Sequence, residues 1–280
     1  MALLLACLAA LSLLAPEADA PGGGTLAEGD AWYARRAEGA RGGTADPGPV
    51  DAAIAAYRRA VVQAPGAIPP RCRLIRALFF RSSFCGAAAG ERRTLLEEAR
   101  RVADAGLEPV EASVNGAEGA ERIEALRRLP GVAQLYFWSA VAWGEWAVAR
   151  GKLAAARQGA GPRIRDLART VIELDVDLEQ GGGHRILGRL HDQSPKIPFL
   201  TGWVSRRLAL ESLRRSLERG PENTVTQLFL AEAILEHDPG RKDEARRLLE
   251  SCASAVPRPD YLVEDAHYAE LARRRLAGMR

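Results

Sequence analysis

Small and apolar side chains recur at fixed intervals in three parts of the chain. In each part an alanine is followed by an apolar residue four positions later, a small residue three after that, and proline five further on. The sets are Ala53, Tyr57, Ala60 and Pro65; Ala209, Leu213, Ser216 and Pro221; and Ala245, Leu249, Cys252 and Pro257. Offsets of four and three place side chains on one face of a helix, which proline ends past its last turn. The pattern predicts three helices that each approach a neighbour closely.

Each of these helices is expected to be the second helix of a hairpin, with its partner directly upstream. A small residue after a large apolar one marks where two helix backbones come close together. Such pairs occur at Leu187-Gly188, Leu230-Ala231 and, in the middle of the chain, Trp143-Gly144. The last pair leads a weaker unit, which continues with Ala168 and Val171 but has Val176 in place of the terminating proline.

The rest of the chain also has helical character. Residues 71–82 and 91–105 predict two further helices, and the apolar run 226–235 continues at helical rather than strand length. Insertions at 39–50 and 151–162 interrupt regular stacking. Because a single hairpin cannot cover its own apolar face, neighbouring hairpins must stack. We therefore expect an all-α fold of eleven or twelve helices, an α-solenoid over residues 27–277 with an extended concave surface.

These spacings resemble the tetratricopeptide repeat (TPR), a helix-turn-helix unit of about 34 residues. Pro221 and Pro257 lie 36 residues apart, near that period. The resemblance implies a TPR-like protein whose concave face binds a partner.

A more specific resemblance covers about residues 130 to 256. It rests on 136–144 (YFWSAVAWG), 173–175 (ELD), 182–188 (GGHRILG) and Ser194-Pro195. These strings are similar to the periplasmic T-component family of TRAP transporters. The likeness implies an exported, often lipid-anchored helical-repeat protein that encloses an apolar channel and works with the substrate-binding protein of a tripartite carrier.

The amino terminus predicts export. Residues 2–15 are uncharged and apolar but too short for the roughly 20 residues of a spanning helix. Residues 1–20 form either a signal peptide cleaved after Ala20 or a lipoprotein signal in which Cys7 carries lipid; the alternative is a buried helix of a cytosolic protein. Residues 21–26 form a flexible linker. We expect a periplasmic location, with membrane contact only through an amino-terminal anchor.

The charge and cysteine content limit the kinds of partner and of cross-link that the protein can have. The net charge is +3, and the 39 basic residues are interspersed with 36 acidic ones, which excludes a nucleic-acid partner. Of the four cysteines, only Cys72 and Cys85 are candidates for a disulfide bridge, and two buried free thiols are the simpler interpretation.

Catalytic and metal motifs are not evident in the sequence. His184 and His191 lie seven residues apart without a third ligand, and Asp175, Asp177 and Glu179 are followed by Gln180 where an EF-hand loop has glycine. A solvated helix end explains these carboxylates. We therefore predict a non-enzymatic protein without cofactor or metal.

Two regions are candidates for ligand or partner binding. Tyr136, Phe137, Trp138, Trp143 and Trp146 are five of the sixteen aromatic residues, within eleven positions. On a helix Trp138 and Trp146 are about 80° apart and Trp138 and Trp143 about 140°, so one core face cannot hold them all. Core packing and a binding groove both remain open for Tyr136, Trp138, Trp143 and Trp146.

The second region is the triple glycine 181–183 with His184 and Arg185, which either holds a carboxylate at a helix start or forms a turn between hairpins. Arg185 is also placed to pair with Asp175 or Glu179. The sequence favours an envelope binding protein that can form a homo-oligomer, and the T-component resemblance implies a TRAP-associated accessory with a protein partner and a small apolar or carboxylate ligand. The alternative is a general envelope scaffold for protein–protein interaction.

Overall fold

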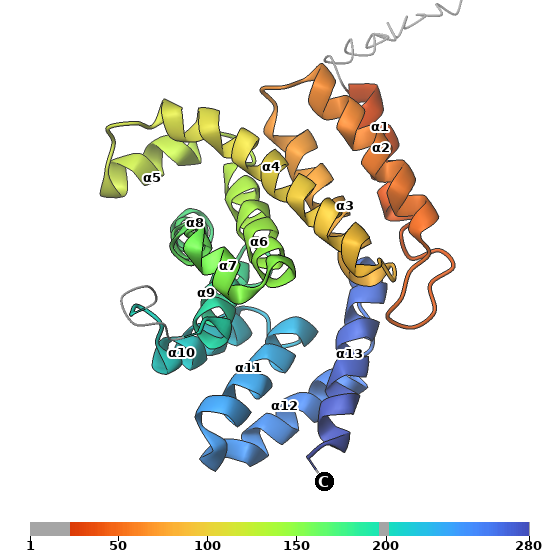
Figure 1. Cartoon of the computed structure of the whole chain (residues 1–280), viewed down its shortest axis with the longest axis vertical. Coiled ribbons are helices and arrows are strands. Elements are labelled where there is room, and N and C mark those ends of the chain that lie inside the picture. Colours follow the sequence, from red (N-terminus) through yellow and green to blue (C-terminus); the bar gives the residue numbers. More distant parts are fainter. Residues whose placement is uncertain (1–22, 196–201, 280) are drawn as a thin grey trace, which may run out of the picture.

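The computed structural model describes residues 23–195 and 202–279, which form a succession of α-helices (Figure 1). The helices are α1 Gly23–Ala34, α2 Pro47–Gln63, α3 Ile68–Phe84, α4 Ala89–Ser113, α5 Gly119–Arg127, α6 Val132–Arg150, α7 Lys152–Arg157, α8 Ala160–Leu174, α9 Gly182–Gln193, α10 Arg206–Arg219, α11 Thr224–His237, α12 Lys242–Ser254 and α13 Leu262–Ala277. Over the described residues the only β feature is an isolated bridge between Arg41 and Thr44. The all-α prediction is confirmed, and residues 23–195 and 202–279 contain thirteen α-helices where eleven or twelve were expected for the chain.

Successive helices pack as hairpins. The pairs α1 and α2, α3 and α4, α6 and α8, α9 and α10, and α11 and α12 are in contact, and each second helix also contacts the hairpin that follows it. Helix α13 packs on α12 and ends the array. The pairs follow one another along a curved path, as Figure 1 shows, so the fold is a solenoid of stacked helical hairpins.

The three repeated sets are buried as their spacing predicts. All nine of their small and apolar residues, from Ala53 to Cys252, have no exposed surface. They lie on α2, α10 and α12, and these helices end at Gln63, Arg219 and Ser254, ahead of the prolines. Because helix interfaces are close-packed, a larger or smaller side chain on the buried face of α2, α10 or α12 would disturb that helix and the helix packed against it.

The small residues of the first helices fall into two classes. At Gly188 an added Cβ would lie 2.6 Å from Cγ of Leu213 and 3.0 Å from the carbonyl oxygen of Ala209, so α9 and α10 touch there. Ala231 is likewise buried between α11 and its neighbours. Gly144 differs, because a Cβ there meets nothing within 4 Å. The interpretation of Trp143-Gly144 as a hairpin contact is therefore wrong.

Local sequence signals begin several helices. Asp46 caps α2 by accepting a hydrogen bond from the Gly48 amide at 2.8 Å, with proline in the first turn. Asn223 caps α11 by accepting from the Thr226 amide at 3.0 Å. The predicted segments 71–82, 91–105 and 226–235 lie inside α3, α4 and α11, and α7 lies within the 151–162 insertion.

The two ends of the solenoid meet. Helices α3, α6, α9, α11 and α13 form an inner layer in which each contacts the next, and α13 returns to contact α3. The loop between α1 and α2 also reaches α13, which lies beside it in Figure 1. The predicted extended concave surface is thus closed into a ring, because α13 contacts α3 and the loop between α1 and α2 bonds to α13.

The predicted amino-terminal signal, including Cys7, lies outside the described residues. Helix α1 begins at Gly23, so residues 23–26 of the predicted linker are helical. None of the described helices has the length and apolar character needed to cross a membrane.

Candidate functional site

The inner layer surrounds a cavity of about 690 Å³. Its wall comes from α3, α6, α7, α8, α9, α11 and α13 and the loops beside them, with single contributions from α1 and α4. A volume of this size is typical of small-molecule sites. Ring closure therefore creates a site to which residues from Tyr33 to Tyr268 contribute.

Aromatic side chains make up much of this wall. They are Tyr33, Phe79, Phe80, Phe84, Phe137, Trp138, Trp203, Phe229, Tyr261 and Tyr268. Several contact one another: the ring centroid of Trp138 lies 5.0 Å from that of Phe137 and 6.2 Å from that of Phe79. These edge-on and tilted pairs hold the rings in place, which gives the cavity a firm apolar surface.

Five arginines and three glutamates also line the cavity. Three of the arginines are in ion pairs: Arg92 with Glu145 at 2.8 Å, Arg189 with Asp192 at 2.8 Å, and Arg258 with Asp265 at 2.7 Å. The Glu264 carboxylate pairs with Arg36 at 3.4 Å. Most of the charge in the wall is therefore neutralised inside the protein.

Arg185 and Arg76 are different, because neither has a carboxylate within 4.0 Å among the described residues. Arg185 donates from both terminal nitrogens to the carbonyl oxygen of Glu179, at 3.1 and 3.2 Å, and weakly to Thr226 Oγ1 at 3.4 Å. Arg76 lies over the rings of Tyr33 and Trp138, 4.8 and 5.8 Å from their centroids. The Glu179 carboxylate and the Tyr261 phenol both act to raise the pKa of each guanidinium group.

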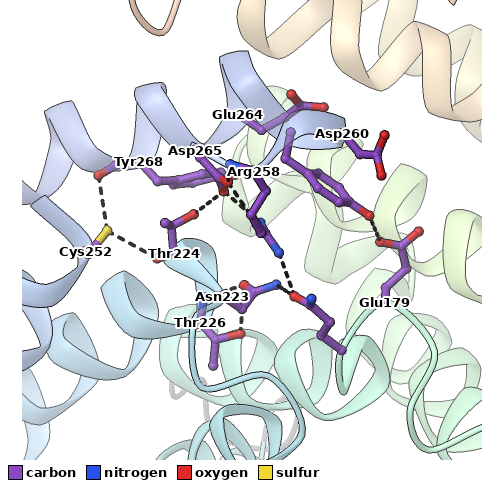
Figure 2. A network of polar contacts seen from close by, with 12 residues as sticks. Glu179, Asn223, Thr224, Thr226, Cys252, Arg258, Asp260, Glu264, Asp265 and Tyr268 are labelled. Carbon is purple, nitrogen blue, oxygen red and sulfur yellow. Dashed lines mark hydrogen bonds and ion pairs between the residues drawn. The ribbon is translucent and has the colours of Figure 1, made fainter. Parts of the chain in front are cut away.

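A polar network supports this side of the cavity (Figure 2). Asp265, only 1% exposed, accepts hydrogen bonds from Arg258 and from Thr224 Oγ1, the latter at 2.7 Å. Arg258 in turn donates to Gln180 Oε1 at 2.7 Å, and Tyr261 donates its hydroxyl to Glu179 Oε2 at 3.1 Å. Figure 2 shows how these side chains join α13 to the segment before α9.

The segment before α9 has an unusual backbone. Glu179 and Gln180 have φ of 50° and 57°, in the left-handed region that non-glycine residues rarely adopt, and Gly181 follows with 74°. The turn brings the carbonyl oxygens of Glu179 and Gln180 to Arg185. Such strain persists only where surrounding contacts fix it, and it is common at binding sites.

Burial shifts the pKa of several groups in the wall. It raises the pKa of Glu145 and of Glu264 even though Arg92 and Arg36 oppose the shift. Burial and the Glu179 carboxylate raise the pKa of Tyr261 to about 12. Burial lowers the pKa of Arg185 despite the opposing field of Glu179. An anion beside Arg185 would favour its charged form.

Two of the six residues that the sequence singled out line the cavity, namely Trp138 and Arg185. Arg185 meets Glu179 as predicted, but through the backbone carbonyl and not the carboxylate. The other four, Tyr136, Trp143, Trp146 and His184, are absent from the wall. For these four the binding interpretation is not supported.

Trp143 and Trp146 belong to a cluster between α4 and α6. Trp143 donates its indole N–H to Asp104 at 2.8 Å, and Trp146 donates to Glu97 at 2.6 Å. Arg100 lies over both rings and pairs with both carboxylates. The cluster fixes α6 against α4 and leaves neither tryptophan facing the cavity.

Tyr136 also packs inside the solenoid. It is 1% exposed and donates its hydroxyl to Glu111 at 2.8 Å, while Arg122 donates to the same hydroxyl at 3.1 Å. The aromatic residues of α6 thus point in different directions, as their angular spacing requires, and only Phe137 and Trp138 reach the cavity.

The triple glycine serves packing. A Cβ on Gly182 would lie 2.4 Å from a ring carbon of Phe137, and one on Gly183 would lie 2.8 Å from Ile172. All three glycines and His184 are buried, so this helix start offers no open anion site. The three glycines therefore form the turn between stacked hairpins. His184 and His191 both lie on α9, but His191 accepts from the Ser205 amide and His184 does not share that contact.

Sequence reasoning missed Arg76, Arg189, Phe229, Tyr261 and Tyr268. They lie far apart in the sequence, and the stacking of α3, α9, α11 and α13 brings them together around the cavity. One signal was available: Arg76 is the single charged residue in the apolar run 74–80. A charge at such a position either pairs inside the core or faces a site.

The chain was compared with known proteins, and no protein-family model and no curated protein matches it.

Proposed function

We propose that this chain is an exported, non-enzymatic binding protein of the cell envelope. In this proposal it acts as a T-component-like partner of a TRAP-type substrate-binding protein. The observation that carries the proposal is the aromatic cavity at the centre of the closed solenoid, which has the size of a small-molecule site.

The strings that resemble the T-component family support it. Residues 136–144 and 182–188 come from α6 and α9, and both strings supply wall residues, among them Phe137, Trp138, Gly144 and Arg185. Gly144, which makes no hairpin contact, widens the cavity because it has no side chain. Part of the resemblance therefore falls on the wall of the candidate site.

The chemistry of the wall favours binding over catalysis. Glu145 and Glu264, whose raised pKa values would suit acid–base chemistry, are each held by an arginine. His267 is packed edge-on against Phe84 and Tyr268, with ring centroids 5.2 and 5.4 Å away. These groups are arranged as structural pairs around an apolar space.

Calorimetric titration of the full chain against a TRAP-type substrate-binding protein encoded in the same gene neighbourhood tests the partner. We expect a 1:1 complex with micromolar or tighter affinity, and an unrelated substrate-binding protein serves as the control. Absence of a complex would overturn the TRAP assignment in favour of the general scaffold.

Export is tested separately. Mass spectrometry of the mature amino terminus should find processing after Ala20 or a lipid on Cys7, and labelling with a palmitate analogue should be lost in Cys7→Ser if the lipid is there. An unprocessed chain in the cytosol would contradict the proposed location.

A further inference from the structure

The charges around the cavity leave a surplus. The lining arginines Arg92, Arg189 and Arg258 and the lining Glu264 each have an ion-pair partner, as described above. Three lining charges remain: Arg76, Arg185 and Glu179, where two positive charges and one negative charge give +1. The Glu179 carboxylate accepts a hydrogen bond from Tyr261 and forms no ion pair among the described residues.

An unneutralised positive charge is energetically unfavourable in an apolar cavity. A guanidinium that faces aromatic rings and lacks a counter-ion has lost part of its hydration without full compensation. A bound anion of one negative charge would neutralise the surplus. Arginine suits this role because its planar fork matches the two oxygens of a carboxylate.

From these observations we propose that the cavity binds an amphipathic monocarboxylate, with the carboxylate held by Arg185 and Arg76 beside Glu179 and the apolar body against Phe79, Trp138 and Phe229. The inference rests on the proposed function as a ligand-binding protein and names the ligand class.

The local geometry prepares Arg185 for this role. Its terminal nitrogens are held by the Glu179 carbonyl, which the left-handed backbone at Glu179 and Gln180 turns toward it. The network from Asp265 through Arg258 to Gln180 fixes that turn against α13 (Figure 2). A guanidinium held before the ligand arrives loses little side-chain freedom on binding.

The wall also excludes other anions. A phosphate dianion would exceed the single surplus charge. A polyhydroxylated acid would place hydroxyl groups against the aromatic faces of Phe79, Trp138 and Phe229, which costs the hydration of those groups. An alkyl or aryl chain instead buries apolar surface there, worth about 25 cal/mol per Å².

The experiment titrates the full chain with sodium octanoate by calorimetry, after removal of any co-purified ligand. Octanamide, with the same chain and no charge, octyl phosphate and acetate are the comparison probes. We expect octanoate to bind at least about tenfold more tightly than octanamide, octyl phosphate and acetate. Equal affinity for octanoate and octanamide, or preference for octyl phosphate, would overturn the proposal.

Variants of the unpaired charges sharpen the test. Arg185→Gln and Arg76→Gln should each weaken octanoate binding about tenfold and remove the preference over octanamide. Glu179→Gln should strengthen octanoate binding, because it raises the surplus from +1 to +2. Arg207→Gln, on the exposed side of α10, should bind octanoate as the wild type does.

The outcomes separate the two proposals. If Arg185→Gln does not fold, as judged by circular dichroism, the opposite effect of Glu179→Gln still decides, and an unchanged or weakened affinity there would contradict the charge argument. Octanoate binding without a complex with the substrate-binding protein would overturn the TRAP assignment alone. A complex without octanoate binding would overturn the ligand class alone.

Discussion

The amide of Gly43 donates a hydrogen bond to Oε1 of Glu270 at 3.0 Å, although 227 residues separate the two in sequence. This contact joins the loop after α1 to α13. Arg36 extends the junction by donating to the carbonyl oxygen of Asp260 and to Glu264. The ring depends on this junction, since it links the first and last parts of the solenoid.

Substituting Gly43 with alanine should loosen the junction. The new Cβ would lie 2.4 Å from Cα of His267, a backbone atom that cannot move aside alone. We expect Gly43→Ala to lower the free energy of unfolding by about 1–3 kcal/mol, as overpacking does. Relative to wild type, the substitution should also increase the rate of amide hydrogen exchange more in α13 than in α10.

Gly90→Ala is the matched control, because a Cβ there meets nothing within 4 Å. It should leave stability unchanged or raise it slightly, since alanine favours the helix. If Gly43→Ala and Gly90→Ala have the same midpoint in urea, the loop does not hold the ring closed.

The tryptophans of α6 should separate into two classes by experiment. Trp146→Phe removes the hydrogen bond to Glu97 and part of a ring that is 4% exposed, so it should cost roughly 1–3 kcal/mol of stability. Its octanoate affinity should not change, because Trp146 is absent from the cavity wall. Trp138→Leu, which alters the wall itself, should weaken octanoate binding. Urea denaturation measures the stability and calorimetry the octanoate affinity. Weaker octanoate binding by Trp146→Phe, with unchanged binding by Trp138→Leu, would contradict the placement of these two residues.

The thiols of the described residues should be inert in the folded protein. Cys72, Cys85 and Cys252 are free and buried, and burial raises the pKa of each to about 12. Since the thiolate is the reactive species, iodoacetamide at neutral pH should not label them until the chain is unfolded. Peptide mass spectrometry distinguishes them from Cys7. Rapid labelling of Cys85, or a Cys72–Cys85 peptide without reduction, would show that the thiols are accessible or bridged.

The buried ion pair of Figure 2 should be far more important than a surface pair. Asp265→Asn leaves Arg258 without its counter-ion and should cost about 3 kcal/mol, since one charge of a mostly buried pair is left alone. Glu211→Gln, whose partners Arg207 and Arg215 are exposed, should cost less than about 1 kcal/mol. Chemical denaturation compares the two. Equal costs would mean that water reaches the Asp265 carboxylate.

The sequence was sufficient for the solenoid because the packing rule is local. Ala209, Leu213 and Ser216 share a helix face by spacing alone, and the proline after them ends the helix, so burial and boundary follow from one short segment. The same reasoning failed at Gly144, where a small residue faces open space and not a neighbouring helix. A small residue shows that space is needed, and does not show what fills it.

The site could be predicted only in part, because it depends on closure. Trp138 and Arg185 were identifiable within one region of the sequence, whereas Arg76 joins them through the packing of α3 on α6, and Tyr268 through the contacts of α13 with α3 and α11. Nothing local specifies those contacts. The sequence also could not show which aromatic residues of α6 face the cavity and which pack elsewhere. Asp104 and Glu97, which accept hydrogen bonds from the indoles of Trp143 and Trp146, lie on another hairpin.

Stability should depend on pH through His184. Burial first, and then the charges of Arg215 and Arg219, lower its pKa, while Glu218 opposes them. In the unfolded chain the imidazole takes up a proton as the pH falls through about 6.5, whereas the folded protein binds that proton only at lower pH. The unfolded state therefore binds more protons in this window, and His184 destabilises the fold as the pH falls.

The measurement compares wild type with His184→Gln, because other groups also titrate. His191 and His267 have lowered pKa values and act in the same direction, whereas the raised pKa values of Glu145 and Glu264 act in the opposite one. Between about pH 7.5 and about pH 5 the wild type should lose more unfolding free energy than His184→Gln. Gly188→Ala disturbs the same α9–α10 interface without a titrating group, so its pH slope should match the wild type. Equal slopes for wild type and His184→Gln would mean that His184 titrates in the fold as it does in the unfolded chain.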